Sequence, residues 1–167
     1  MILDIFPPNT MICNGETLPC VLGKSGVTKN KCEGDNATPV GLWPMRKAFY
    51  RPDRLQKPET SLVTRAITPK DGWCDDPKQP LYNKHIYKPF NGGYEDLWRH
   101  DEVYDLIIVL GFNDAPVVPG MGSAIFMHVA RFDLSETEGC IALELPNLQS
   151  VIKDCSNDSF VNVHPAP

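Results

Sequence analysis

The sequence predicts a mainly β fold, a β-sandwich or barrel-like arrangement of short strands with one or two short helices. The 167-residue chain contains 16 prolines and 12 glycines, scattered rather than repeated, which is typical of many turns between short elements. Short apolar runs recur between these turns, and few of them have helical spacing. At this length we expect a single domain, residues 1–167, with its core over about residues 18–155.

Turn residues and apolar runs place the expected strands. Gly23, Ser25 and Gly26 lie between short apolar stretches, which indicates a first hairpin within residues 18–28. The run at 103–111 is nearly continuously apolar and bounded by glycine, as in a buried strand. Further strands are expected over residues 42–50, 61–68, 123–130, 140–145 and 160–163.

Two short helices and one long irregular segment complete the expected fold. Pro146 suits the first turn of a helix, which predicts a helix over 146–154. Tyr94, Leu97 and Trp98 have helical spacing, which predicts another over 94–102. Residues 69–93 are dense in proline, aspartate and asparagine, so we expect loops there, at the rim of a site.

Charge and hydropathy exclude several function classes. The net charge of −5 leaves no basic footprint, so nucleic-acid binding is not expected. No apolar run approaches the ~20 residues that span a bilayer, so no transmembrane segment is expected. Residues 1–8 have neither a basic start nor a long apolar stretch, and they are not interpreted as a secretory signal.

The six cysteines favour buried thiols over a metal site. They stand at positions 13, 20, 32, 74, 140 and 155, and no pair has the Cys-x₂₋₄-Cys spacing of zinc knuckles. Disulfides in an oxidising compartment are the alternative, although full pairing would consume Cys140. We expect most of these cysteines to be small, buried apolar residues.

Cys140 and His128 are the candidates for chemistry. Gly139 precedes Cys140 and an apolar run follows it, so a substrate can approach the thiol closely and backbone amides can face a developing oxyanion. A thiol of ordinary pKa is mostly protonated at neutral pH and needs a base. His128 lies in an apolar strand, on the face shared by Ala124 and Phe126 if the side chains alternate.

Three stretches, in order, resemble the YkuD family of L,D-transpeptidases. Thr38-Pro-Val-Gly-Leu-Trp resembles its early Thr-Pro signature, Gly122-Ser-Ala-Ile-Phe-Met-His its histidine strand, and Thr137-Glu-Gly-Cys-Ile its nucleophile motif. The segment from Asp71 to Pro77, with Tyr82 and Asn83, is similar to a short proteobacterial branch of the family. Together the matching stretches cover most of residues 23–152, and their combination is specific where each alone is not.

The resemblance implies a β-sandwich enzyme of peptidoglycan biosynthesis, acting in the cell envelope on cell-wall structure and cell shape. It implies that Cys140 attacks an L-to-D bond of a stem peptide, that His128 takes the thiol proton, and that the Val129 carbonyl holds the other ring nitrogen. The amides of Gly139 and Cys140 would form the oxyanion hole. No metal or organic cofactor is implied; stem peptides are the implied partners, and carbapenem-type β-lactams the implied inhibitors.

Two departures from the family pattern concern substrate binding. The segment between His128 and Thr137 is shorter than in the family, and Glu138 replaces the usual histidine. We hypothesise that Glu138 binds an ammonium of diaminopimelate. The other predicted substrate contacts are Thr137, Arg131, Asn83 and Tyr82.

Three other functions stay open on sequence alone. An L,D-peptidase or carboxypeptidase would hydrolyse the same bonds, and a non-catalytic module would only bind the cell wall. A papain-like peptidase fits less well, because His128 precedes Cys140 in this chain and follows the cysteine in those enzymes.

Overall fold

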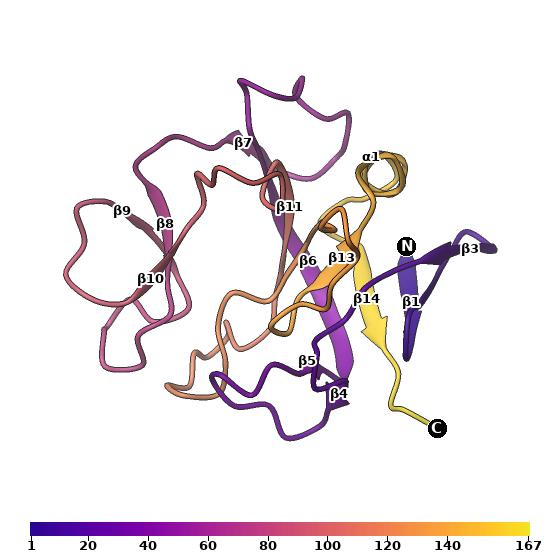
Figure 1. The fold of residues 1–167 in the computed structure, drawn as a ribbon, viewed down its shortest axis with the longest axis horizontal. Coiled ribbons are helices and arrows are strands. Elements are labelled where there is room, and N and C mark those ends of the chain that lie inside the picture. Colours follow the sequence, from indigo (N-terminus) through magenta and orange to yellow (C-terminus); the bar gives the residue numbers. More distant parts are fainter.

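The computed structural model describes all residues, 1–167, and consists mainly of β-strands (Figure 1). The strands are β1 (Ile2–Phe6), β2 (Thr10–Cys13), β3 (Glu16–Pro19), β4 (Val27–Thr28), β5 (Thr38–Pro39), β6 (Gly41–Tyr50), β7 (Thr64–Ala66), β8 (Asp71–Cys74), β9 (His85–Tyr87), β10 (Tyr94–Asp96), β11 (Leu106–Leu110), β12 (Phe126–Val129), β13 (Ile141–Leu143) and β14 (Phe160–Val163). The helix is α1 (Leu145–Lys153). The prediction of a mainly β fold with a short helix is confirmed.

The largest sheet runs in the order β13-β12-β11-β6-β14-β1-β2-β3, with β7 paired to β6. β11 lies between β6 and β12 and is antiparallel to both. All five of its residues are buried, which explains its continuous apolar sequence. The predicted strand over 103–111 is therefore confirmed in its central part, and those over 42–50 and 160–163 are confirmed as β6 and β14.

The two faces of this sheet pack into separate cores. A first core of 24 buried residues includes Met127 and Val129 of β12 together with Leu148 and Ile152 of α1. A second core of 11 buried residues includes Phe126 and Cys140. Alternate side chains of β12 point toward opposite cores. The strand therefore presents Phe126 and His128 toward the second core.

A separate three-stranded sheet, β10-β8-β9, lies to one side of the large sheet (Figure 1). It supplies Trp73 to the second core. Two predictions are wrong here, because residues 69–93 contain β8 and β9 and residues 94–102 contain no helix. Tyr94 and Asp96 pair with Cys74 and Gly72 of β8, so strand pairing outweighs the helical spacing of the apolar residues.

The hairpins lie earlier than predicted, because β1 pairs with β2 and β2 with β3, each antiparallel. The turn between β2 and β3 consists of Asn14 and Gly15, both of which have positive φ, +50° and +82°. This pair is the usual solution for a two-residue hairpin turn, because both positions need left-handed backbone. Residues 18–28 contain only the end of β3 and the two-residue strand β4.

The remaining predictions concern the helix and the cysteines. The helix expected over 146–154 is confirmed as α1, with a proline at its start. All six cysteines are free thiols; five are buried, as expected, and Cys32 is exposed. No helix has the length and apolar character needed to cross a membrane.

Candidate active site

The loop that carries Cys140 is folded by the side chain of Thr137. The Thr137 hydroxyl donates to the Cys140 carbonyl oxygen over 2.7 Å and accepts a hydrogen bond from the Gly139 N–H over 3.1 Å. Gly139 has a φ of +133°, and a Cβ at this position would lie 2.8 Å from the Ala37 carbonyl oxygen. The loop therefore needs glycine beside the thiol for both backbone conformation and space.

The early Thr-Pro motif is part of the same structure. The Thr38 hydroxyl, on β5, accepts a hydrogen bond from the Gly23 N–H over 2.9 Å and lies 3.5 Å from the Cys140 carbonyl oxygen, to which it donates. Gly23 in turn forms a β-bridge with Thr137. Two motifs separated by about a hundred residues therefore support one loop, which explains why they occur together.

The Cys140 thiol is buried and neutral. Its sulfur donates to the Ala124 carbonyl oxygen over 3.1 Å and accepts a hydrogen bond from the Phe126 N–H over 3.4 Å. Burial raises the pKa of the thiol to about 12, and the charge of Glu95 adds to this rise. A base must therefore remove the proton during any reaction at this sulfur.

His128, on β12, is held in one tautomer. Its Nδ1 lies 2.9 Å from the Val129 carbonyl oxygen, and because a carbonyl can only accept, Nδ1 carries the hydrogen. Nε2 has no partner within the chain and is left with its lone pair. Burial lowers the pKa of the imidazole to about 4, so the ring is neutral at pH 7.

The fold brings His128 and Cys140 to one pocket. β12 and β13 are parallel, and His128 pairs with Ala142, two residues beyond Cys140. Both side chains line a cavity of about 310 Å³. In the resting structure the thiol proton is directed to the Ala124 carbonyl oxygen, so proton transfer to His128 Nε2 requires the S–H bond to rotate away from that acceptor. The pair can supply a nucleophile and a neutral base.

One of the two predicted oxyanion donors is occupied. The Gly139 N–H is already donated to the Thr137 hydroxyl, because that side chain closes the turn. The Cys140 N–H has no acceptor within the chain. The Cys140 amide is therefore the one that is free to meet a developing negative charge beside the sulfur.

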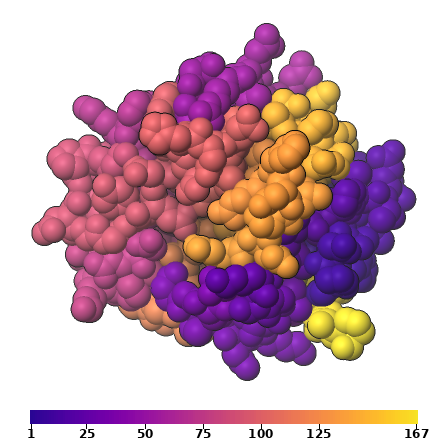
Figure 2. Space-filling view, in the orientation of Figure 1, coloured from indigo at the N-terminus to yellow at the C-terminus, as the bar shows by residue number.

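Both signs of charge line the pocket. Figure 2 shows the segments around residues 25–40, 90–105 and 130–145 meeting on one face of the molecule. The charged residues among the lining are Lys31, Glu33, Asp75, Glu95, Arg99, Arg131 and Glu138. Such a lining can bind a substrate that carries both ammonium and carboxylate groups.

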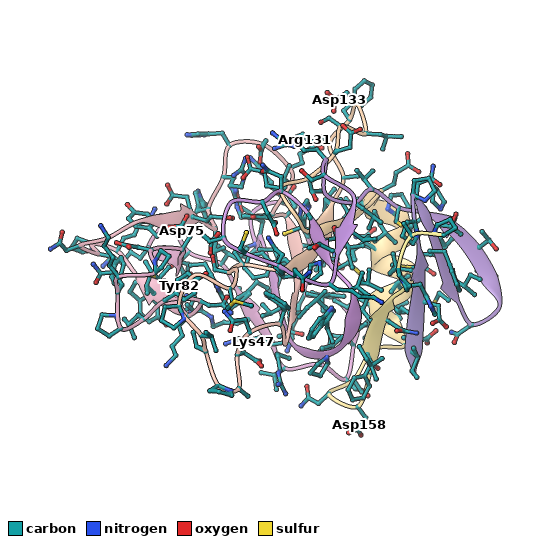
Figure 3. All side chains as sticks on the ribbon, turned by 90° about the horizontal axis from the view of Figure 1, so that it is seen from below. Lys47, Asp75, Tyr82, Arg131, Asp133 and Asp158 are labelled. Carbon is teal, nitrogen blue, oxygen red and sulfur yellow. The ribbon has the colours of Figure 1, made fainter.

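Three of the predicted substrate contacts line this pocket: Thr137, Glu138 and Arg131. Thr137 is buried and its hydroxyl is engaged within the loop, whereas Glu138 and Arg131 are exposed. Figure 3 shows Arg131 and Asp133 on a loop that projects from the body of the molecule. Glu138 and Arg131 therefore present exposed charged groups at the pocket. The Thr137 hydroxyl instead stabilises the loop through its hydrogen bonds to Gly139 and Cys140.

The other two predicted contacts, Tyr82 and Asn83, are not among the residues that line the pocket. Both side chains are buried. The Tyr82 hydroxyl is bonded to Glu33 and to the Gly122 N–H, and the Asn83 amide is bonded to Trp73 and to backbone groups. The polar atoms of both side chains are therefore bonded to other groups of the protein in this structure.

Sequence reasoning missed several residues that line the site, among them Lys31, Glu95, Arg99 and Tyr104. The Tyr104 ring packs edge-on against His128, with centroids 5.5 Å apart, and its hydroxyl donates to Glu95. Burial raises the pKa of the Glu95 carboxyl. In the sequence, the available signal for this part of the site was Tyr104, an aromatic residue shortly before the aliphatic run at 106–110.

Comparison with known proteins identifies the family. The family model described as the L,D-transpeptidase catalytic domain, YkuD, matches residues 7–163, nearly the whole chain. A comparison with curated proteins gives no match. The matched range contains the Thr38 motif, the His128 strand and the Cys140 loop. The fold places His128 and Cys140 in one pocket and bonds Thr38 to the backbone of the Cys140 loop. The chain therefore belongs to the YkuD family of L,D-transpeptidase catalytic domains.

Proposed function

We propose that the chain is a peptidoglycan L,D-transpeptidase in which Cys140 is the nucleophile and His128 the base. The observation that carries the proposal is the arrangement of the pair. A buried thiol, a neutral imidazole with a free Nε2, and the free Cys140 amide all belong to one pocket of a family member. These are the groups that acyl transfer to sulfur requires.

In the first half of the reaction, the sulfur attacks the carbonyl carbon of an L-to-D bond in a donor stem peptide. The thiol proton passes to His128 Nε2, and a C–S bond forms while the carbonyl oxygen takes negative charge beside the Cys140 N–H. The C–N bond then breaks, and the leaving amine takes the proton from His128. The product is a thioester on Cys140 and a released amine, with His128 neutral again.

In the second half, the side-chain amine of a diaminopimelate residue in another stem attacks the thioester. The amine arrives as an ammonium and must first lose one proton to solvent. It then forms the new C–N bond, the C–S bond breaks, and its second proton returns to the sulfur through His128. The product is a 3-3 or 1-3 cross-link. Attack by water in place of the amine would make the enzyme an L,D-peptidase or carboxypeptidase.

The charges of the pocket support a peptide substrate with ionic groups. Glu138 is exposed beside Cys140 and has no salt-bridge partner in the chain, so it can bind the acceptor ammonium. Arg131 is exposed, with only a 3.5 Å contact to the Glu136 carbonyl oxygen, and can pair with a stem carboxylate. The reaction uses only protein side chains and amides, and no cofactor takes part.

The proposed substrate fixes the proposed location. Peptidoglycan lies outside the cytoplasmic membrane, so the enzyme would act in the periplasm or cell envelope and contribute to cell-wall biogenesis. Carbapenem-type β-lactams carry a strained acyl group that the same sulfur can attack, and we propose that they acylate Cys140.

The test of this function is mass spectrometry of purified muropeptides incubated with the wild-type protein and with Cys140→Ala. We expect cross-linked dimers with the wild type and none with the variant, because the variant has no sulfur to carry the acyl group. Fragmentation of the dimers identifies which stem positions are joined. Cys20→Ala, which removes a different buried thiol, is the matched control and should leave the products unchanged.

The other outcomes separate the alternatives. Shortened monomers without dimers, lost in Cys140→Ala, would replace transfer by hydrolysis. Unchanged muropeptides with every protein, and no thioester on Cys140 in the intact mass, would contradict the enzymatic function and leave a wall-binding module.

A second prediction concerns Glu138. If its carboxylate binds the acceptor ammonium, Glu138→Gln should raise the KM for the acceptor about tenfold, since a charge-assisted hydrogen bond of roughly 1.5–3 kcal/mol is replaced by a neutral one. Thioester formation from the donor should keep its rate. Glu136→Gln, a neighbouring exposed carboxylate outside the cysteine pocket, is the control. An unchanged KM for both substrates would show that the Glu138 side chain does not bind the acceptor ammonium.

A further inference from the structure

The turn that precedes β12 has an unusual backbone. Gly122 and Ala124 both have positive φ, +106° and +53°. Glycine adopts such values freely, but alanine does not, because its Cβ crowds the following carbonyl oxygen. Other groups in the structure must therefore hold Ala124 in this conformation.

Asn83 provides that support. Its Oδ1 accepts hydrogen bonds from the Ala124 N–H and from Trp73 Nε1, each over 3.0 Å. Its Nδ2 donates to the carbonyl oxygens of Phe112 and Asn113 over 3.0 and 2.8 Å. All four hydrogen-bonding positions of the amide are thus used, and the amide cannot rotate without losing several of them.

The neighbouring residue, Tyr82, holds the same turn. Its hydroxyl accepts a hydrogen bond from the Gly122 N–H over 3.0 Å and donates to Glu33. The Ser123 hydroxyl donates to the same Glu33 carboxylate over 2.8 Å. Two consecutive side chains, Tyr82 and Asn83, therefore fix both ends of residues 122–124, hereafter the thiol turn.

The last residue of the thiol turn, Ala124, contacts the Cys140 sulfur. The Ala124 carbonyl oxygen accepts the Cys140 S–H over 3.1 Å, and the Phe126 N–H, two residues later, donates to the same sulfur over 3.4 Å. The resting position of the sulfur is thus defined by backbone groups on either side of Ile125. That backbone path depends on Ala124 keeping its left-handed conformation.

We infer that Asn83 is a positioning residue for Cys140: by holding Ala124 in the left-handed conformation, it aims the Ala124 carbonyl at the thiol and keeps the sulfur beside the His128 pocket. The inference rests on the proposed function, since it concerns the sulfur as nucleophile. It also replaces the predicted substrate contact of Asn83 by a role that acts through the backbone.

Asn83→Gly tests this role without adding backbone strain, because Asn83 itself has a φ of +55° that glycine adopts freely. Without the amide, Ala124 can relax to a negative φ and its carbonyl turns away from the sulfur. A thiol that loses the acceptor of its proton ionises more readily. The sulfur also loses its fixed position, which slows attack on a bound peptide.

Two rates are measured. The first is alkylation of Cys140 by iodoacetamide between pH 6 and 10, followed on the Cys140 peptide by mass spectrometry. The second is thioester formation with disaccharide-tetrapeptide monomers. For Asn83→Gly we expect the alkylation rate at each pH to rise about threefold or more, which corresponds to a fall of about 0.5 unit in the pKa of the thiol. We expect thioester formation to slow about tenfold or more. The two changes have opposite sign, faster alkylation at neutral pH and slower acylation.

Two controls separate positioning from stability. Asn14→Gly makes the same substitution at another left-handed asparagine, φ +50°, in the turn between β2 and β3. Leu3→Ala destabilises the first core on β1, where no residue lines the cysteine pocket. Both should keep the wild-type alkylation and acylation rates at temperatures where they are folded.

The outcomes are distinct. An alkylation rate and an acylation rate in Asn83→Gly equal to those of Leu3→Ala would overturn the inference and make Asn83 only structural. If Asn83→Gly does not fold, Tyr82→Phe decides, because it removes the hydroxyl that binds the Gly122 N–H of the thiol turn. A faster alkylation of Cys140 at neutral pH supports the inference, and an unchanged rate overturns it. Absence of any thioester in the wild type would contradict the proposed function instead.

Discussion

Replacement of His128 by glutamine is expected to slow acylation of Cys140 about 10³-fold, within the range that a positioned base contributes. The reason lies in the two neutral groups of the pocket. Burial raises the pKa of the thiol to about 12, so almost no thiolate exists at pH 7 without a base. Burial lowers the pKa of His128 to about 4, so its Nε2 is available to take the proton. Glutamine has no basic nitrogen.

The measurement is the rate of thioester formation by intact-protein mass spectrometry in single-turnover conditions. His164→Gln is the matched control, because His164 pairs with Asp4 and does not line the cysteine pocket. This variant should acylate at the wild-type rate. Acylation of His128→Gln at more than a tenth of the wild-type rate would mean that another group, or solvent, removes the thiol proton.

The same variant has a second readout, in stability. The pKa of His128 is about 4 in the folded protein against an ordinary 6.5. Between these values the unfolded chain binds a proton that the folded protein does not, so stability is present above pH 6.5 and is lost as the pH falls toward 4. The loss is about 3 kcal/mol. Urea unfolding should show this part of the acid slope in the wild type and not in His128→Gln.

Gly139→Ala is expected to destabilise the protein by about 3 kcal/mol or more and to abolish acylation. A Cβ would lie 2.8 Å from the Ala37 carbonyl oxygen, and the φ of +133° is strained for any residue with a side chain. Relief of the clash moves the loop, and with it the Cys140 N–H that faces the developing oxyanion. Thermal unfolding and thioester formation measure the two effects.

Gly15→Ala is the control for the backbone contribution alone. Its φ of +82° is also left-handed, but no atom lies within 4 Å of the Cβ position. It should lose about 1 kcal/mol and keep full activity. Equal stability losses in the two variants, with acylation retained in Gly139→Ala, would show that the contact with Ala37 is easily relieved and that the loop geometry is not essential.

The sequence predicted those elements whose pattern is local. The apolar run at 106–110, the proline at the start of α1 and the alternation at 160–163 each specify an element by themselves. The run at 94–102 failed because its three apolar residues fit a helix as well as a bend after a short strand. Only the pairing of Tyr94 with Cys74, about twenty residues away, decides between them.

The sequence indicates candidates for the reacting groups of the site but not the contacts that support them. Cys140 and His128 stand in recognisable strings, and the fold brings both to one pocket. No local pattern shows that the Thr137 hydroxyl takes the Gly139 amide, or that Asn83 faces Ala124 instead of the pocket. The first contact depends on the direction of one side chain, and the second joins segments that are distant in sequence. Each is determined only when the backbone is folded.

The position of β14 has a consequence for how the protein is made. β14 lies between β6 and β1, so the strand nearest the end of the chain pairs in parallel with the strand at its beginning, Leu3 beside Val161. The large sheet cannot be completed until residues 160–163 have left the ribosome. The pairing of β1 with β14 therefore waits until more than 150 intervening residues have been made, and contacts of such long sequence separation form slowly. Loss of the final eight residues would remove an interior strand, with β1, β2 and β3 left detached from β6.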